Sequence, residues 1–267
     1  MNVASPRRHR ISIRRIRRIG GNTWGKQFGL RLYNVHGGFI VSLLDLFFPK
    51  RCVGCKKVGC YLCSWCRRTC IPIAPNECIC PVCGKLAIDG ATHPSCQSRY
   101  SLDGLTSFFY YRDAVRSFIR VLKYQFVTDT AETFITLIPL SSYIISSLMG
   151  AEHVILVPIP LHPNRQKQRG FNQSALVGQL LAKKLKIPID DTLLHRVVYT
   201  TSQVEMRSRE ARRKNIPPQA FQVAPIPENT IILLFDDVFT TGATMRSAGN
   251  ALKWAGAKMV WGVTMAR

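Results

Sequence analysis

Three scarcities in the sequence narrow the classes of protein to consider. Its 267 residues contain no uninterrupted run of about 20 apolar residues, so no membrane span is expected. Acidic residues are few, 15 against 37 lysines and arginines, and the net charge of +22 favours anionic partners such as nucleic acid or phosphorylated metabolites. All 10 cysteines lie between Cys52 and Cys96, and without a clear export signal this clustering argues against a secreted disulfide protein.

The rest of the composition is that of a folded protein. Hydrophobic residues make up 46% of the chain and charged residues 19%, and the length suits one large domain or two small ones. The positive charge is concentrated at the start, where residues 1–51 carry eleven bases and one acid. We therefore expect residues 1–39 to form a flexible basic arm, with an arginine-rich organelle transit segment as the alternative.

The cysteines are spaced as metal ligands. They form CxxC pairs, and a last pair of the same spacing begins with histidine; two residues between ligands let both side chains reach one ion, and tetrahedral Zn²⁺ takes four. We predict two structural zinc sites in chain order, one from Cys52, Cys55, Cys63 and Cys66 and one from Cys80, Cys83, His93 and Cys96. Two alternatives stay open, since Cys78 could replace His93 and the pairs could interleave. A module of about 45 residues buries too little surface to fold alone, so the metal would supply its folding energy.

From Leu102 onward, strand and helix patterns alternate. Strands are predicted at Thr106–Tyr111, Val154–Val157, Ile231–Phe235 and Lys258–Ala266, and helices over residues 114–126, 173–186 and 244–254. Continuous apolar strands separated by helices predict a parallel sheet covered on both faces. In such sheets, ligands bind at the carboxyl ends of the strands.

The most specific motif follows the apolar run Ile231–Phe235. Two acids come first and a short loop of small and hydroxyl residues leads into a helix: Asp236, Asp237, then Thr240, Thr241, Gly242, Ala243 and Thr244. Loop amides and a helix N-terminus form an anion cradle, and small residues let the backbone approach a phosphate closely. No lysine follows the glycine, so this is not a Walker A loop. Carboxylates beside a phosphate cradle suit a ribose 5-phosphate; a solvated Asp-Asp turn is the alternative.

This motif resembles the phosphoribosyl-pyrophosphate (PRPP) motif of type I phosphoribosyltransferases. The resemblance implies that Asp236 and Asp237 hold the ribose 2- and 3-hydroxyls, that Thr240–Thr244 holds the 5-phosphate, and that Mg²⁺ arrives with the pyrophosphate. It also implies that catalysis rests on positioning and charge stabilisation, so no nucleophilic side chain is needed.

Two basic stretches accompany the motif. The first follows strand Val154–Val157 and contains Arg165, Lys167 and Arg169 before a helix start at Asn172 and Gln173; it suits a pyrophosphate, with a solvated basic loop as the alternative. The second contains Gln203, Arg212 and Asn215 and is too polar for a core helix, which leaves a lid over the ligand or a nucleic-acid surface.

Together these motifs resemble the ComF family of competence-associated proteins. The resemblance covers roughly residues 40–267 and rests on VPIPL with RxxxRGFNQ, on TxQ with RxxN and AF, and on DDVxTTGAT. The lead-in from Leu43 to Pro49 before Cys52 fits the start of that family, and Leu122-Lys123-Tyr124 fits it too. It implies a double zinc ribbon at 40–98 and a type I phosphoribosyltransferase-like α/β domain at 99–267. The arm 1–39 is extra, and His93 stands where a cysteine is usual.

The resemblance implies a link to natural transformation, in the cytoplasm and at the inner membrane face. Two functions follow from it. One is an enzyme that transfers phosphoribosyl from PRPP to an unidentified acceptor. The other is a module that binds single-stranded DNA or a competence protein and retains a PRPP site. Aromatic residues near bases, among them Trp65 and Tyr100, could stack on unpaired bases, although Phe108–Tyr111 fits the core of a strand better.

Overall fold

The structure is a computed structural model that describes residues 49–124, 128–139, 153–161, 172–197 and 220–267. All of them belong to one compact unit, Leu43–Arg267. The expected basic arm, residues 1–39, lies outside the described residues, and the predicted boundary between residues 98 and 99 stays a prediction. No helix in the described ranges is long and apolar enough to cross a membrane.

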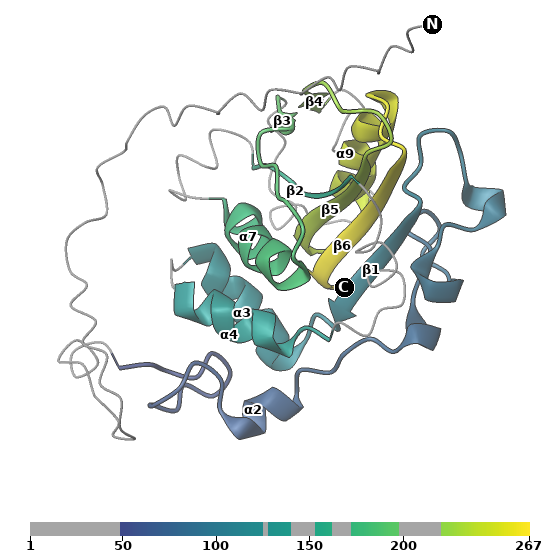
Figure 1. The fold of residues 1–267 in the computed structure, drawn as a ribbon. Helices are drawn as coiled ribbons and strands as arrows, with labels where there is room; N and C mark the ends of the chain where they lie inside the picture. The colour runs from purple at the N-terminus through teal and green to yellow at the C-terminus, as the bar shows by residue number, and fades with distance from the viewer. Residues whose placement is uncertain (1–48, 125–127, 140–152, 162–171, 198–219) are drawn as a thin grey trace, which may run out of the picture. The chain divides into compact units, whose positions relative to one another are not determined.

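A four-stranded parallel sheet forms the centre of the described fold (Figure 1). Its order is β1-β6-β5-β2, with β1 at Gly104–Phe109, β2 at Val154–Pro158, β5 at Ile231–Val238 and β6 at Met259–Ala266. These strands are the ones the sequence predicts, to within two residues at most ends. The exception is β5, which continues through both aspartates to Val238, because Asp236 and Val238 still pair with β6.

Helices cover both faces of the sheet (Figure 1). On one side lie α3 (Asp113–Tyr124), α4 (Thr128–Leu137) and α7 (Gln173–Leu185), and on the other lies α9 (Ala243–Trp254). Strand β5 divides its side chains between them: Leu233 and Phe235 pack with the α7 side, and Ile232 and Leu234 with the α9 side. The predicted α/β class is therefore confirmed, as a parallel sheet flanked by helices and preceded by a module with two metal-ligand clusters.

Two features were not predicted. Helix α4 was not predicted, because its sequence is rich in threonine and its apolar positions are irregular. In the structure, Phe134 of this helix is fully buried against Phe109 and Phe118. A two-stranded antiparallel sheet of β3 (Leu194–Arg196) and β4 (Phe221–Val223) packs on the α9 side; its strands are too short to give a period in sequence.

The metal-ligand module, residues 51–96, contains little regular structure. It has one short helix, α2 (Ser64–Arg68), and the 3₁₀ turns η1 (Pro75–Glu77), η2 (Ile88–Gly90) and η3 (Pro94–Cys96). Its backbone lies along the outer edge of β1, where the amide of Ile73 donates to Phe108 and that of Thr92 donates to Asp103, both at 2.9 Å. The module therefore covers an edge strand that would otherwise be open to pairing with another chain.

Candidate functional site

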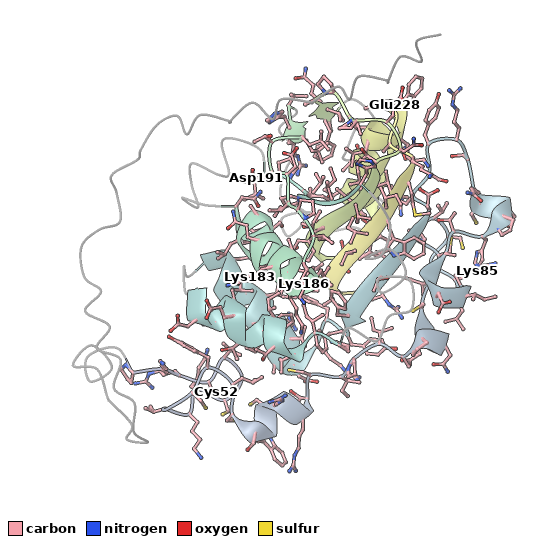
Figure 2. The ribbon with its side chains drawn as sticks, in the orientation of Figure 1. Cys52, Lys85, Lys183, Lys186, Asp191 and Glu228 are labelled. Atoms are coloured by element: carbon pink, nitrogen blue, oxygen red, sulfur yellow. The ribbon has the colours of Figure 1, made fainter. Side chains whose placement is uncertain are left out.

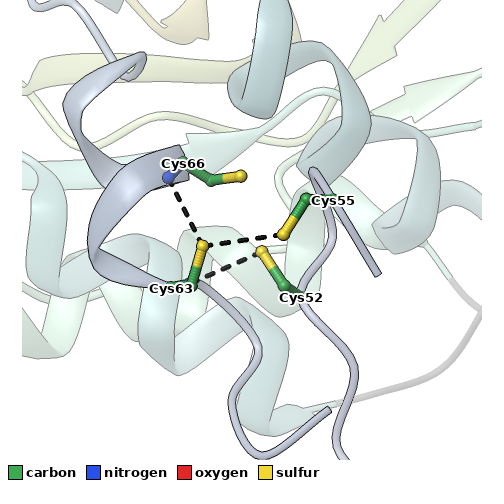
Figure 3. Close-up of side chains that lie close together, drawn as sticks. All are labelled: Cys52, Cys55, Cys63 and Cys66. Atoms are coloured by element: carbon green, nitrogen blue, oxygen red, sulfur yellow. Dashed lines mark hydrogen bonds between the residues drawn. The ribbon is translucent and has the colours of Figure 1, made fainter. Parts of the chain in front are cut away.

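The first metal-ligand cluster joins Cys52, Cys55, Cys63 and Cys66 (Figure 3). Their sulfur atoms all lie within 4.8 Å of one another, and the Cys55 and Cys63 sulfurs are 3.7 Å apart. Cys63 caps helix α2, so that its sulfur accepts from the amide of Cys66 at 3.5 Å, while the amide of Cys63 donates to the sulfur of Cys52 at 3.4 Å. Local turns thus bring the sulfur atoms of two CxxC pairs, which lie eight residues apart in the sequence, within reach of a single metal ion.

Backbone amides prepare this cluster for metal. Burial alone would raise the pKa of Cys52, but hydrogen bonds from the amides of Cys63, Cys55 and Gly54 outweigh it and lower the pKa to about 6. Burial raises the pKa of Cys66 to about 12, so a metal that binds this sulfur would have to displace its proton into solvent. A methyl group on Gly54 would stand 2.6 Å from the Cys66 sulfur, which explains why glycine follows Val53 in this knuckle.

The second cluster consists of Cys80, Cys83, His93 and Cys96. The Nδ1 atom of His93 is 3.4 Å from the Cys83 sulfur, and its Nε2 atom is 2.9 Å from the carbonyl of Leu86. If Nε2 carries the proton and donates to that carbonyl, Nδ1 keeps its lone pair for a metal, which is the usual arrangement of a ligating histidine. Cys78 instead directs its thiol to the carbonyl of Ala74 at 3.8 Å and lies outside the cluster.

Both predicted ligand sets, with the pairs in chain order, are confirmed as clusters, and the alternatives of Cys78 or interleaved pairs are wrong. Three or four thiols with at most one imidazole form the donor set that structural Zn²⁺ prefers. Four protein ligands fill a tetrahedral shell, so this chemistry suits structure rather than catalysis.

A candidate ligand site, separate from the two metal-ligand clusters, lies where strand β5 ends. Asp237 is buried, and its Oδ2 atom forms an ion pair of 2.9 Å with the Nζ atom of Lys123 from helix α3. Asp236 is partly buried, and its Oδ1 atom accepts from the hydroxyl of Ser174 on helix α7 at 3.3 Å and from the amide of Asp237 at 2.8 Å. Each carboxylate is therefore held by a different helix on the same side of the sheet.

Burial and a neighbouring charge set the protonation of Asp236. Burial and the neighbouring charge of Asp237 raise the pKa of Asp236 to about 7, despite the hydrogen bonds and the Lys123 charge that oppose them. Burial tends to lower the pKa of Lys123, but Asp237 outweighs it and raises that pKa, so the lysine stays charged. One carboxylate paired with lysine and one poised near neutral pH is an arrangement typical of functional sites.

The loop after β5 makes a tight turn into helix α9. Gly242 has φ 73° and caps helix α9, and a Cβ atom there would lie 2.4 Å from the Phe239 ring, so both conformation and space require glycine. The hydroxyl of Thr241 accepts from the amide of Ala243 at 3.4 Å, and Thr240 is exposed. The first turn of α9 thus directs its amides to the edge of the sheet where the two acids lie.

The chain is similar to bacterial competence and DNA utilization proteins. No family model matches the chain. It is 34% identical over 117 residues to Competence protein F of Haemophilus influenzae, a match that covers 42% of this chain and 50% of that protein. It is 25% identical to Competence protein ComFC of Bacillus subtilis, covering 65% of this chain and 71% of that protein, and 34% identical to DNA utilization protein YhgH of Salmonella typhi, covering 39% and 45%. The chain thus spans about half the length of two of these three relatives.

These relatives support the resemblance to the ComF family. The sites of this chain combine residues from distant parts of the sequence: Lys123 precedes Asp237 by 114 positions, and Asn172 caps the helix that carries Ser174. Of the residues expected at a pyrophosphate loop, Asn172 accepts from the Ser174 amide at 3.1 Å and Gln173 is buried beside it.

Several predicted site residues cannot be compared. Arg165, Arg169, Gln203, Arg212 and Asn215 lie outside the described residues. Ser174, in contrast, was not predicted from the sequence, although its hydroxyl donates to Asp236. Its signal in the sequence was its place as the second residue of α7, the helix that follows β2, and β2 lies next to β5 in the sheet.

Proposed function

We propose that the chain binds PRPP at the carboxyl end of β5 and transfers its phosphoribosyl group to an acceptor that is still unidentified. The observation that carries the proposal is the acid pair at the end of a central parallel strand, braced by Lys123 and Ser174 and followed directly by the glycine-capped start of α9. This is the position at which open α/β sheets bind ligands.

In this proposal the two acids bind the ribose of PRPP and the loop binds its 5-phosphate. Asp236 and Asp237 accept hydrogen bonds from the ribose 2- and 3-hydroxyls, while Thr240, Thr241, Thr244 and the loop amides hold the 5-phosphate. Lys123 holds the Asp237 side chain in position before the ligand arrives, through an ion pair of 2.9 Å. Mg²⁺ bound to the pyrophosphate of PRPP would neutralise part of the ligand's charge.

The proposed reaction needs no nucleophile from the protein. The bond between ribose C1 and the pyrophosphate oxygen breaks, and pyrophosphate leaves with the electron pair. The acceptor forms the new bond at C1 and gives its proton to solvent. The protein contributes position and charge stabilisation of an oxocarbenium-like ribose.

The proposal is tested by PRPP-dependent thermal stabilisation. Asp236→Asn with Asp237→Asn should abolish it, because two charged acceptors of the ribose diol become neutral amides that each carry only one acceptor oxygen. The chain offers a matched control in a second Asp-Asp pair, Asp190 and Asp191, on the segment between α7 and β3 (Figure 2). The same two substitutions there change the net charge equally and should leave PRPP stabilisation intact. Equal stabilisation of both double variants would refute the assignment.

A second candidate function is the binding of single-stranded DNA. The relatives' names, Competence protein and DNA utilization protein, and the net charge of +22 favour it, since a PRPP site needs only a few anion contacts. In this proposal the chain acts in the cytoplasm, at the inner membrane face, with other proteins of DNA uptake as partners.

The basic arm provides the test of this second function. Residues 1–39 hold nine of the eleven bases in residues 1–51. Each phosphate neutralised on a single strand adds about −0.7 to the slope of log affinity against log salt, so deleting residues 1–39 should lower that slope by several units and leave PRPP stabilisation unchanged. An unchanged slope would exclude the arm as a contact, and full competition between PRPP and DNA would mean that the two ligands share one site.

A further inference from the structure

Two aromatic side chains form a stack on the surface of the described fold. The rings of Tyr100 and Trp254 are 4.2 Å apart between centroids and lie within 10° of parallel. Trp254 is nevertheless 69% exposed. A ring that is covered on one face by a partner and still so exposed must present its other face to solvent. The indole is the last residue of α9, about 17 Å along that helix from the proposed phosphate loop.

The stack is held rigidly from both sides. In the amide orientation that satisfies its neighbours, the side-chain nitrogen of Asn250, one turn before Trp254, donates to the carbonyl of Tyr100 at 2.6 Å. Lys253 forms an ion pair of 3.1 Å with Asp103, and the other contact of that carboxylate is the amide of Val260 at 2.7 Å. The segment that carries Tyr100 is therefore tied to α9 before any partner arrives, which reduces the entropy lost on binding.

The surroundings of the stack are basic. The guanidinium of Arg99 lies 5.5 Å from the centre of the Tyr100 ring, and Arg99 itself is exposed. Lys258 is also exposed, and its carbonyl accepts from Lys253 at 3.2 Å. Neither Arg99 nor Lys258 belongs to an ion pair with a described residue, and the acid nearest the stack in these contacts, Asp103, is already paired with Lys253.

We infer that Tyr100 and Trp254 form a stacking platform for an unpaired base of a single-stranded nucleic acid, with Arg99 and Lys258 facing the adjoining phosphates. An open aromatic face beside uncompensated cations is what such binding requires, because every base offers a π face and every linkage a negative charge. The inference rests on the second proposed function, single-strand binding, and assigns a surface to it that is separate from the PRPP site.

The experiment measures fluorescence anisotropy of a labelled oligothymidine of about 20 nucleotides, longer than the site of one binding fold, across a salt series. Trp254→Ala should weaken binding by about 5- to 150-fold, the range for loss of one stacked base, without changing the salt slope. Trp254→Phe should restore most of the affinity. Arg99→Ala should instead lower the slope by about 0.7, because it removes a phosphate contact.

Trp65 is the matched comparison, because the sequence offers this second exposed indole for stacking as well. It is 72% exposed on helix α2 and has no ring neighbour among the described aromatic pairs. Trp65→Ala removes an equally exposed indole and should leave affinity within about twofold, as expected for a surface change of no more than a few tenths of a kcal/mol. Equal effects of Trp65→Ala and Trp254→Ala would overturn the platform.

Two other outcomes also decide the matter. If the wild-type chain does not bind the oligonucleotide, the single-strand function fails and the platform fails with it. If the wild-type chain binds, but Trp254→Ala changes only its oligomeric state, the platform alone fails and the indole is a protein contact. An abasic strand of the same length should bind wild type and Trp254→Ala equally, because it has no base to stack.

Discussion

The metal-ligand module and the parallel sheet use their polar residues in opposite ways. Among the described residues, six of the eight large apolar side chains that stay exposed lie in the module: Val58, Trp65, Ile71, Val82, Leu86 and Ile88. The module thus depends on its thiols for stability. In the sheet, Ile232, Leu233 and Leu234 are completely buried, and stability comes from apolar burial, while the acid pair is an addition that burial penalises. Removing polar groups should therefore unfold one region and be tolerated in the other.

Metal removal should give the largest effect. Structural zinc contributes about 10–16 kcal/mol of apparent binding free energy in small modules, so chelation should unfold residues 51–96. The amides of β5 and β6 should keep their protection from hydrogen exchange, while those facing the module along β1 should lose it, because the module covers that edge. Native mass spectrometry should detect two zinc ions per chain before chelation.

A smaller loss of structure on chelation would contradict the proposed difference between the module and the sheet. If chelation left exchange in the module unchanged, apolar packing would hold it, and the cluster of Cys52, Cys66 and Ala114 would be the place where that packing occurs. One zinc per chain would instead mean that the cluster containing His93 does not bind metal.

The second effect concerns the ion pair of Lys123 and Asp237. Asp237→Ala should destabilise the chain by about 3 kcal/mol, at the low end for a broken buried pair because Lys123 is still 23% exposed at its side chain. Lys123→Met combined with Asp237→Asn should recover most of that loss, since no charge is left unpaired. Urea unfolding measures both. If the double variant were as unstable as Asp237→Ala, the lost stability would come from the loss of the ion pair itself and not from the unpaired charge of Lys123.

The same contrast explains what the sequence could predict. Both zinc ligand sets were predicted because their members lie close together in sequence, in pairs whose spacing reflects the geometry of one knuckle. The acids and the loop that follows them were predicted for the same reason. Lys123 was named only through a family resemblance, and Ser174 was missed, because each reaches the acids from another helix and no local pattern marks it.

The third effect is a pH dependence that belongs to the sheet. Asp236 has a pKa of about 7 in the folded chain, whereas an unfolded aspartate has about 3.9. The folded state therefore holds a proton that the unfolded state has lost, so this group's contribution to stability falls as pH rises from about 4 to about 7. Asp236→Asn should remove that fall in a series of urea unfolding curves.

The affinity for PRPP should change with pH in the direction opposite to that of stability. The ionised carboxylate of Asp236 is a stronger acceptor for a ribose hydroxyl than the protonated acid, so PRPP affinity should rise with pH up to about 7 and fall below it. Titrating Asp236→Asn in parallel separates this dependence from that of the PRPP phosphates, which both proteins share. Identical pH profiles would mean that Asp236 does not face the ligand.

The smallest effect distinguishes a hydrogen bond that supports the site from one that only supports the sheet. The Ser174 hydroxyl donates to Asp236, and the Ser107 hydroxyl pairs with Thr264 at 2.8 Å; both serines are buried. Either serine changed to alanine should cost about 1 kcal/mol in urea unfolding. Only Ser174→Ala should also move the pH midpoint of PRPP binding upward, because the ionised form of Asp236 loses a donor that favours it. If Ser107→Ala moved the midpoint as far, the shift would come from general loosening of the sheet, and Ser174 would have no part in setting the charge of the acid pair.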